Sequence, residues 1–207
     1  MSQVNPLHYN GGAVFAATGN QCVAIAADRR FGQAQLTLAC DANRLFRVHD
    51  RLVLGLTGLA TDCLTLAERV RMRTNLYRLG EKREPKPATI SALVSALLYE
   101  RRFAPYFVEP VIVGLSGDNK PYCCSMDLLG TPMETDEFVA AGTCAESLYG
   151  TGETFWRPGL DPEDLFEVTA QCMLAALDRD CLSGWGAVVY VLHSEGVTVR
   201  ELKARMD

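Results

Sequence analysis

The chain has 207 residues, of which 48% are hydrophobic and 22% are charged, and its formal net charge is −5 at pH 7. This length and composition predict one domain with a substantial core, which excludes an intrinsically disordered protein. The acidic balance and the lack of an apolar run of roughly 18 residues argue against nucleic acid and membrane as partners.

The first part of the chain is predicted to form short strands at hairpin spacing. Apolar or alternating runs of five or six residues are separated by residues typical of turns. The predicted strands span residues 13–17, 22–27, 36–40, 44–48 and 52–57.

Two helices are predicted next. From residue 58 to about residue 79, apolar side chains recur three and four positions apart, which is the spacing of one helical face. Residues 80–87 form a charged connector broken by prolines, and a second helix is predicted over residues 88–101.

The second half repeats this order of strands, two helices and strands. Its later helix has a clear start, because Asp161 is a preferred N-cap residue and Pro162 suits the first helical position. The predicted elements are strands at 110–115, 122–127 and 137–141, helices at 144–156 and from 161 onward, and strands at 186–193 and 198–202.

Helices that occur in pairs between runs of strands predict two packed sheets with helices outside them. The predicted fold class is therefore α+β, arranged as a four-layer αββα sandwich.

The cysteines and histidines do not suggest a metal site or disulfides. The eight cysteines include no CxxC pair, and the three histidines are scattered. We interpret the cysteines as small hydrophobic residues of a reducing compartment, and we expect no metal or other cofactor. Residues 1–6 lack the pattern of a secretory signal, so we expect the protein in the cytoplasm and the nucleus.

Six segments carry a family resemblance. They are YNGG at 9–12, CVAIAADRRFG at 22–32, GLTGLATD at 55–62, LYERRFAPYF at 98–107, RDCLSGWG at 179–186 and LKARMD at 202–207. In this order they resemble the β-type subunits of the 20S proteasome core, and specifically its non-catalytic members.

This resemblance implies a fold and a set of partners. The fold is the αββα sandwich of N-terminal-nucleophile hydrolases, with an extension at residues 1–9 and a single β-type domain at residues 10–207. The implied partners are other proteasome α and β subunits, assembled in hetero-oligomeric stacked rings. The implied process is ubiquitin-dependent protein degradation.

The nucleophile of the active family members is missing from this chain. Those members use an N-terminal threonine, and a hydroxyl nucleophile needs an adjacent base and a nearby cation. The resemblance assigns Gly11 or Gly12 to that position, and glycine has no hydroxyl or thiol. Arg44 replaces a lysine, and a guanidinium stays protonated, so it cannot shuttle protons. We therefore expect a subunit that is not an enzyme.

Other positions of the catalytic framework are present. By resemblance, Asp28 corresponds to the aspartate near the end of the second strand, and Asp180 and Ser183 correspond to the pair that orients the terminal amine. Thr143 corresponds to a supporting serine, and Gly58 to the glycine whose backbone N–H is an oxyanion donor.

Each of these residues also has a structural interpretation, which we favour because fold does not imply function. Asp28 suits a turn or an ion pair at the end of a strand. Arg44 suits a solvent-facing or structural cation. Asp180 and Ser183 suit a turn at the end of a helix, together with Gly184.

Two alternatives to a structural subunit remain open. One is an active N-terminal-nucleophile hydrolase with an unrecognised nucleophile. Removal of Met1 would expose Ser2, but Ser2 lies about nine residues before the first strand, a span of roughly 30 Å when extended. The other alternative is a free-standing binding module with the same fold.

The resemblance also suggests a contribution to a neighbour's substrate site. Family pockets form between adjacent subunits, and the position that lines the neighbouring pocket falls on Asp127, with Thr131 nearby. The neighbour would be the β2 subunit, whose activity is trypsin-like, and an acid would favour the basic side chains of a peptide substrate. The alternative is an ordinary turn aspartate.

Two aromatic segments, residues 103–107 and 155–158, combine residue types that are enriched in protein interfaces. The alternative is that these residues belong to the core at the ends of helices.

Overall fold

The apolar strands predicted from the sequence pair into two five-stranded sheets in the computed structural model, which describes residues 5–206. The first sheet has the order β10-β1-β2-β11-β12, and every neighbouring pair is antiparallel. Its strands are β1 (Ala13–Thr18), β2 (Val23–Asp28), β10 (Phe138–Gly142), β11 (Ala187–His193) and β12 (Gly196–Leu202).

The second sheet has the order β5-β6-β7-β8-β9 and is also antiparallel throughout. A separate hairpin, β3-β4, leads from the first sheet toward the second. These strands are β3 (Phe31–Gln33), β4 (Leu36–Ala39), β5 (Leu45–His49), β6 (Leu52–Gly58), β7 (Val108–Leu115), β8 (Pro121–Met126) and β9 (Pro132–Thr135).

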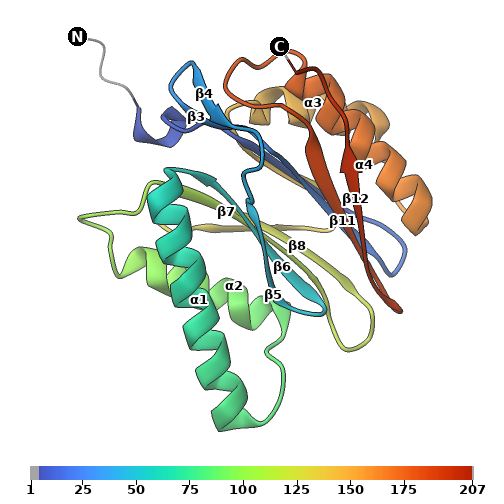
Figure 1. The fold of residues 1–207 in the computed structure, drawn as a ribbon. Helices are drawn as coiled ribbons and strands as arrows, with labels where there is room; N and C mark the ends of the chain where they lie inside the picture. Colours follow the sequence, from blue (N-terminus) through green and yellow to red (C-terminus); the bar gives the residue numbers. More distant parts are fainter. Residues whose placement is uncertain (1–4, 207) are drawn as a thin grey trace.

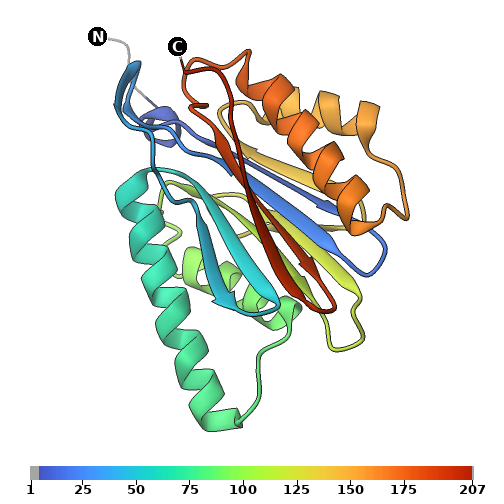
Figure 2. The same cartoon turned by 45° about the vertical axis from the view of Figure 1, so that its right-hand side comes forward.

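A pair of helices covers the outer face of each sheet (Figure 1). Figure 2 shows the same four layers after rotation, with α1 and α2 on the second sheet and α3 and α4 on the first. The arrangement confirms the predicted αββα sandwich. The helices are α1 (Ala60–Glu81), α2 (Pro87–Tyr99), α3 (Ala145–Phe155) and α4 (Pro162–Leu177).

Four layers require three apolar cores, and the structure has three clusters of buried side chains. Strands β1 and β2 are buried along their whole length, because one face meets helices and the other meets the second sheet. The core between the sheets includes Val14, Ile25, Val53 and Val111. The core between the first sheet and its helices includes Phe15, Leu148 and Met173. The core between the second sheet and its helices includes Leu66, Ile90 and Leu98.

The cysteines fit the interpretation as small hydrophobic residues. Six of them are buried and all eight are free thiols, while Cys40 and Cys181 are exposed. Within residues 5–206, none of the helices combines the length and the hydropathy that a bilayer crossing requires.

The sequence prediction missed two strands and one detail of capping. Strands β3 and β9 are only three and four residues long, and β9 is largely exposed, so neither carries an apolar pattern. Asp161 takes the N-cap position of α4, but its side chain accepts no capping hydrogen bond. The first predicted helix starts later than expected, at Ala60, because Gly58 is still the last residue of β6.

The segment before β1 is tied to the domain. Residues Pro6–His8 form a short 3-10 helix, and the Tyr9 carbonyl accepts a hydrogen bond of 2.7 Å from the Ala34 amide. The buried side chain of Asn10 donates to the Gly32 carbonyl at 2.9 Å and accepts from the Ala60 amide at 2.9 Å. These contacts fix the entry of the chain into β1. The boundary between an extension and the domain stays a prediction.

The middle core gives a first prediction. Ile25→Ala removes a fully buried side chain between the sheets, and we expect a loss of about 2–5 kcal/mol in the free energy of unfolding. Urea unfolding of the purified full-length chain measures this loss. Val199→Ala, at a side chain that is 51% exposed on β12, is the control, with an expected change of about 0.5 kcal/mol. Equal losses for the two variants would contradict the layered core.

Candidate functional site

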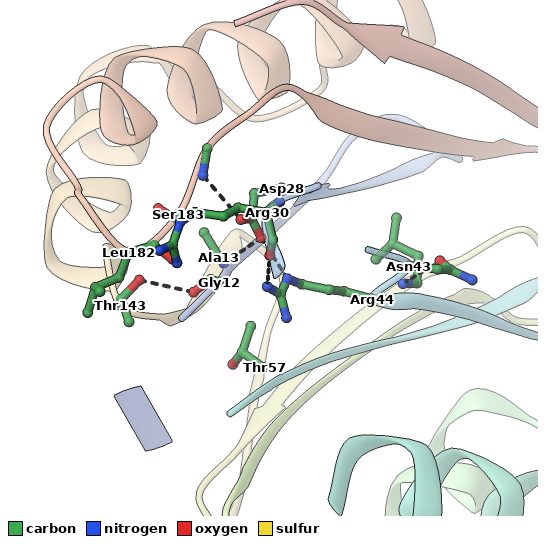
Figure 3. Close-up of polar contacts among 12 residues, drawn as sticks. Gly12, Ala13, Asp28, Arg30, Asn43, Arg44, Thr57, Thr143, Leu182 and Ser183 are labelled. Carbon is green, nitrogen blue, oxygen red and sulfur yellow. Dashed lines mark hydrogen bonds and ion pairs between the residues drawn. The ribbon is translucent and has the colours of Figure 1, made fainter. Parts of the chain in front are cut away.

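The predicted framework residues meet at one end of the two sheets, around the start of β1 (Figure 3). Gly12 precedes β1, Asp28 ends β2, and Arg44 precedes β5. Thr143 follows β10, and the loop of residues 178–186 connects α4 to β11. Chain segments that are far apart in sequence therefore contribute to one cluster.

Asp28 is the centre of this cluster. Its carboxylate is fully buried and accepts four hydrogen bonds. Oδ1 accepts from the Ala13 amide at 3.0 Å and from Arg44 Nε at 2.7 Å. Oδ2 accepts from the amides of Arg30 at 3.3 Å and Gly184 at 3.1 Å. A buried carboxylate needs such partners, and here they come from both sheets and the loop before β11. The interpretation as an ion pair at the end of a strand fits this geometry.

Arg44 is a structural cation and not a solvent-facing one. Its side chain is only 5% exposed, and it donates to Asp28 and to the Arg30 carbonyl. A Cβ atom built on Gly12 would lie 2.4 Å from Arg44 Cζ and 2.6 Å from Nε, closer than real contacts allow. The guanidinium therefore occupies the space that a side chain at position 12 would need. Gly12 also has φ +127°, a conformation that side-chain-bearing residues rarely adopt.

Gly11 is restricted in a different way. A Cβ atom there would lie 2.0 Å from the Leu182 carbonyl oxygen, and its φ is +67°. Of the two positions that the sequence left open, Gly12 is the one beside Arg44, and its carbonyl oxygen accepts a hydrogen bond of 2.9 Å from the Thr143 amide.

Asp180, Ser183 and Thr143 form a second polar group next to Gly12. Asp180 Oδ2 accepts from Thr143 Oγ1 at 2.5 Å and from Ser183 Oγ at 2.5 Å, while Oδ1 accepts from the Leu182 amide at 3.0 Å. The Thr143 hydroxyl lies 3.3 Å from the Gly12 carbonyl oxygen. Both hydroxyls thus donate to one carboxylate, which holds the turn before β11. The geometry fits the interpretation as a turn at the end of a helix, and the role of orienting a terminal amine stays a prediction.

Arg30 belongs to the cluster and was missed by the sequence interpretation. Its side chain is 1% exposed and donates three hydrogen bonds, to Thr37 Oγ1 at 2.9 Å, to the Leu182 carbonyl at 3.0 Å and to the Ala34 carbonyl at 3.1 Å. It fastens the β3-β4 hairpin to the loop before β11. Its position two residues after Asp28 was the one available signal, since its backbone amide donates to Asp28 Oδ2.

The Cys144 thiol beside this cluster is not activated as a nucleophile. Burial raises the pKa of Cys144 to about 12, and although its contact with Ser183 acts the other way, the thiol stays protonated at neutral pH. Thr57 is fully buried. The rival nucleophile Ser2 lies outside the described residues.

Gly58 ends β6 in a conformation that suits glycine. Its φ is +110°, and a Cβ atom would lie 2.3 Å from the Phe107 carbonyl oxygen. Its assignment as an oxyanion donor stays a prediction.

Asp127 and Thr131 lie elsewhere, in the exposed loop between β8 and β9. Asp127 Oδ1 accepts hydrogen bonds from the amides of Leu129 at 3.0 Å and Thr131 at 2.7 Å, so the side chain shapes a turn. The loop rests on α2, where Ser95 Oγ donates to the Gly130 carbonyl at 2.6 Å. The turn interpretation therefore holds, and it leaves the carboxylate at the surface.

The two aromatic segments are divided between surface and core. Phe103 is 94% exposed and Phe155 is 40% exposed. Tyr106 is buried under α1 and α2, and Trp156 packs on the other outer core with its Nε1 donating to the Thr18 carbonyl at 3.0 Å. The core interpretation therefore holds for Tyr106 and Trp156, and the interface interpretation of the exposed side chains stays a prediction.

The fold and this cluster define a subunit with the architecture of an N-terminal-nucleophile hydrolase, in which Gly12 lies beside the Arg44 guanidinium. The chain belongs to the proteasome subunit family, whose family model matches residues 8–192. Like the family, it assembles with other proteasome subunits in rings, and its β type-3 relatives mark it as a non-catalytic member.

Relatives place the chain among the β type-3 subunits. A protein of Drosophila melanogaster named "Proteasome subunit beta type-3" is 52% identical over 202 residues, covering 97% of this chain and 98% of the relative. Proteins of the same name from Picea mariana and Caenorhabditis elegans are 52% and 45% identical, covering 96% and 97% of this chain and 98% of each relative. These matches confirm the resemblance that the six sequence segments suggested.

The contact between Gly12 and Arg44 gives a second prediction. Gly12→Thr forces a side chain into the guanidinium, and we expect a loss of about 1–3 kcal/mol in the free energy of unfolding and no peptidase activity. Arg44→Lys removes the obstructing group, so the double variant should lose less than the sum of the single variants, by about 0.5–3 kcal/mol. Urea unfolding of the four full-length chains measures this coupling. Additive losses would contradict the steric argument.

The Asp28 pair gives a third prediction. Asp28→Asn leaves the buried Arg44 guanidinium without its counter-charge, and we expect destabilisation of about 3–5 kcal/mol in urea unfolding. Asp50→Asn is the control, because the Arg47–Asp50 pair is exposed and contributes about 0–1 kcal/mol. Similar effects of the two substitutions would show that Asp28 does not organise the cluster.

Proposed function

We propose that this chain is a structural β3-type subunit that completes the β ring and helps to shape the substrate pocket of the neighbouring β2 subunit. The observation that carries the proposal is the Arg44 guanidinium in the space of a side chain at position 12, within a buried network. A guanidinium fixed there supports a framework that holds the fold and performs no acyl transfer. The process served is ubiquitin-dependent protein degradation, in the cytoplasm and the nucleus.

The loop between β8 and β9 is the part of the chain that we assign to the neighbouring pocket. Asp127 is exposed, and its two hydrogen bonds within the turn both involve Oδ1. The turn therefore orients the carboxylate while its negative charge remains at the surface. Such a charge attracts the basic side chains of a peptide substrate. Thr131, whose amide closes the turn, is the second residue that we assign to the pocket wall.

The partners that we propose are proteasome α and β subunits and, at the neighbouring pocket, a peptide substrate. Exposed apolar side chains such as Phe103 and Phe155 are suited to burial in contacts with other subunits. We assign no nucleic-acid or membrane partner, in accordance with the net charge of −5.

The pocket assignment gives a fourth prediction. In assembled particles, Asp127→Asn should lower kcat/KM for cleavage after Lys or Arg by roughly two- to five-fold, because one surface charge contributes about 0–1 kcal/mol. The asparagine keeps an Oδ1 acceptor for the turn, so the loop conformation is retained. Fluorogenic peptides with basic, acidic and apolar residues at the cleavage position measure the effect.

Asp118→Asn, at an exposed acid in the turn between β7 and β8, is the matched control for that substitution. Unchanged cleavage after basic residues in Asp127→Asn particles, or an equal loss for all three peptide types, would remove Asp127 from the pocket wall.

A further inference from the structure

A basic cavity lies at the end of the second sheet where the β5-β6 and β7-β8 turns are. The other end of this sheet is where β6 leads into α1. The cavity has a volume of about 810 Å³ and is enclosed by the β5-β6 turn, the end of α1 with its connector to α2, and the β7-β8 turn. The cationic and imidazole side chains that line it are Arg47, His49, Arg51, Arg78, Arg83 and Lys86. It shares none of its lining residues with the cluster around Asp28.

The charge of this cavity is opposite to that of the whole chain. Five lysine and arginine side chains line it against two acids, Asp50 and Glu84, whereas the chain as a whole carries −5. Concave sites lined by one sign of charge concentrate the field and attract ions of the other sign. The cavity is therefore suited to an anion.

The acids in the cavity do not neutralise its cations firmly. Arg47 pairs with Asp50 at 2.9 Å, and Arg78 pairs with Glu84 at 2.7 Å, in pairs whose side chains are 45% exposed or more. Exposed ion pairs are weak and exchange readily with solvent and with other partners. Both guanidinium groups are thus available to a stronger anion.

Two buried nitrogen atoms in the lining have no hydrogen-bond partner, and one of them belongs to the charged Arg51 guanidinium. Arg51 Nε has no hydrogen-bond partner, although another nitrogen of this guanidinium donates to Asn119. Burial lowers the pKa of His49, which favours the neutral ring. Its Nδ1 accepts a hydrogen bond of 3.2 Å from the Arg51 amide, so the hydrogen of the neutral ring is on Nε2. That nitrogen is also without a partner, since the Pro85 carbonyl near the ring does not meet it with hydrogen-bond geometry.

Lys86 contributes a further unbalanced cation. It is exposed, it occupies the N-cap position of α2 without a side-chain hydrogen bond, and the first turn of that helix has no acidic residue. The N-terminus of a helix carries partial positive charge and favours anions, so a lysine there is the reverse of the usual arrangement. An anion bound beside Lys86 would balance the charge of the lysine and the partial positive charge of the helix N-terminus.

We propose that this cavity binds a compact polyanion that carries several phosphate groups. Four of its cations are arginines, whose planar guanidinium groups match phosphate oxygens in pairs. The volume lies within the range of small-molecule sites, which is about 300–1,000 Å³. A phosphate group carries about −1.5 to −2 charges, so one short polyphosphate balances the excess of cations. An acidic peptide would need several residues to do the same.

Calorimetric titration with inorganic tripolyphosphate tests the proposal, on the purified full-length chain and on assembled particles. We expect saturable binding that weakens as the salt concentration rises. Arg83→Ala combined with Lys86→Ala changes two exposed side chains and should weaken binding by about tenfold or more. Arg71→Ala, at an exposed arginine of α1 that pairs with Glu68 outside the cavity, should bind as the unchanged chain does.

Three results would each overturn the proposal. They are no saturable binding to the unchanged chain and particle, equal binding by the double variant, and tighter binding of a glutamate-rich peptide than of tripolyphosphate. Adenosine triphosphate as a second ligand distinguishes a nucleotide from a free polyphosphate, since either supports a phosphate site. Particle assembly and peptide cleavage report on the structural role separately, and we expect neither to change in the double variant.

Discussion

The buried carboxylate of Asp28 is the constraint on which the rest of the site depends. It ends β2 of the first sheet, yet its strongest partner is Arg44, at the entrance to β5 of the second sheet. It also fixes the first amide of β1 and the Gly184 amide in the loop before β11. Because a buried charge without a partner is very costly, these segments must arrive together. One side chain thereby couples the two sheets at the end where β1 begins.

The glycine at position 12 and the arginine at position 44 form one structural feature. The family resemblance treated them as two separate departures from the pattern of active members. In the structure, the guanidinium of Arg44 fills the volume that a side chain on Gly12 would occupy. Glycine makes room for the larger cation, and the cation secures Asp28 and the Arg30 carbonyl. The remaining polar group of Asp180, Ser183 and Thr143 then serves to hold a turn.

The sequence predicted the layers because their strands and helices carry strong local patterns. Strands β1 and β2 are continuous apolar runs, and the helices occur in pairs between the strand groups. The missed elements had no such pattern: β3 and β9 have only three and four residues, too few to show an apolar alternation, although each pairs with the strand next to it in sequence. Arg30 was missed because a charged residue suggests the surface, and the carbonyls that satisfy it come from separate loops. The choice between Gly11 and Gly12 required the position of Arg44, which no local pattern contains.

The central claim is that this framework holds the fold and does not mature into a nucleophile. The most direct test is the intact mass and N-terminal sequence of the chain isolated from native particles. Our account predicts a chain that still carries the residues before Gly12, because no side chain at position 12 can drive cleavage. A chain that begins at a hydroxyl or thiol residue within the first strand would contradict the account and make this subunit an enzyme.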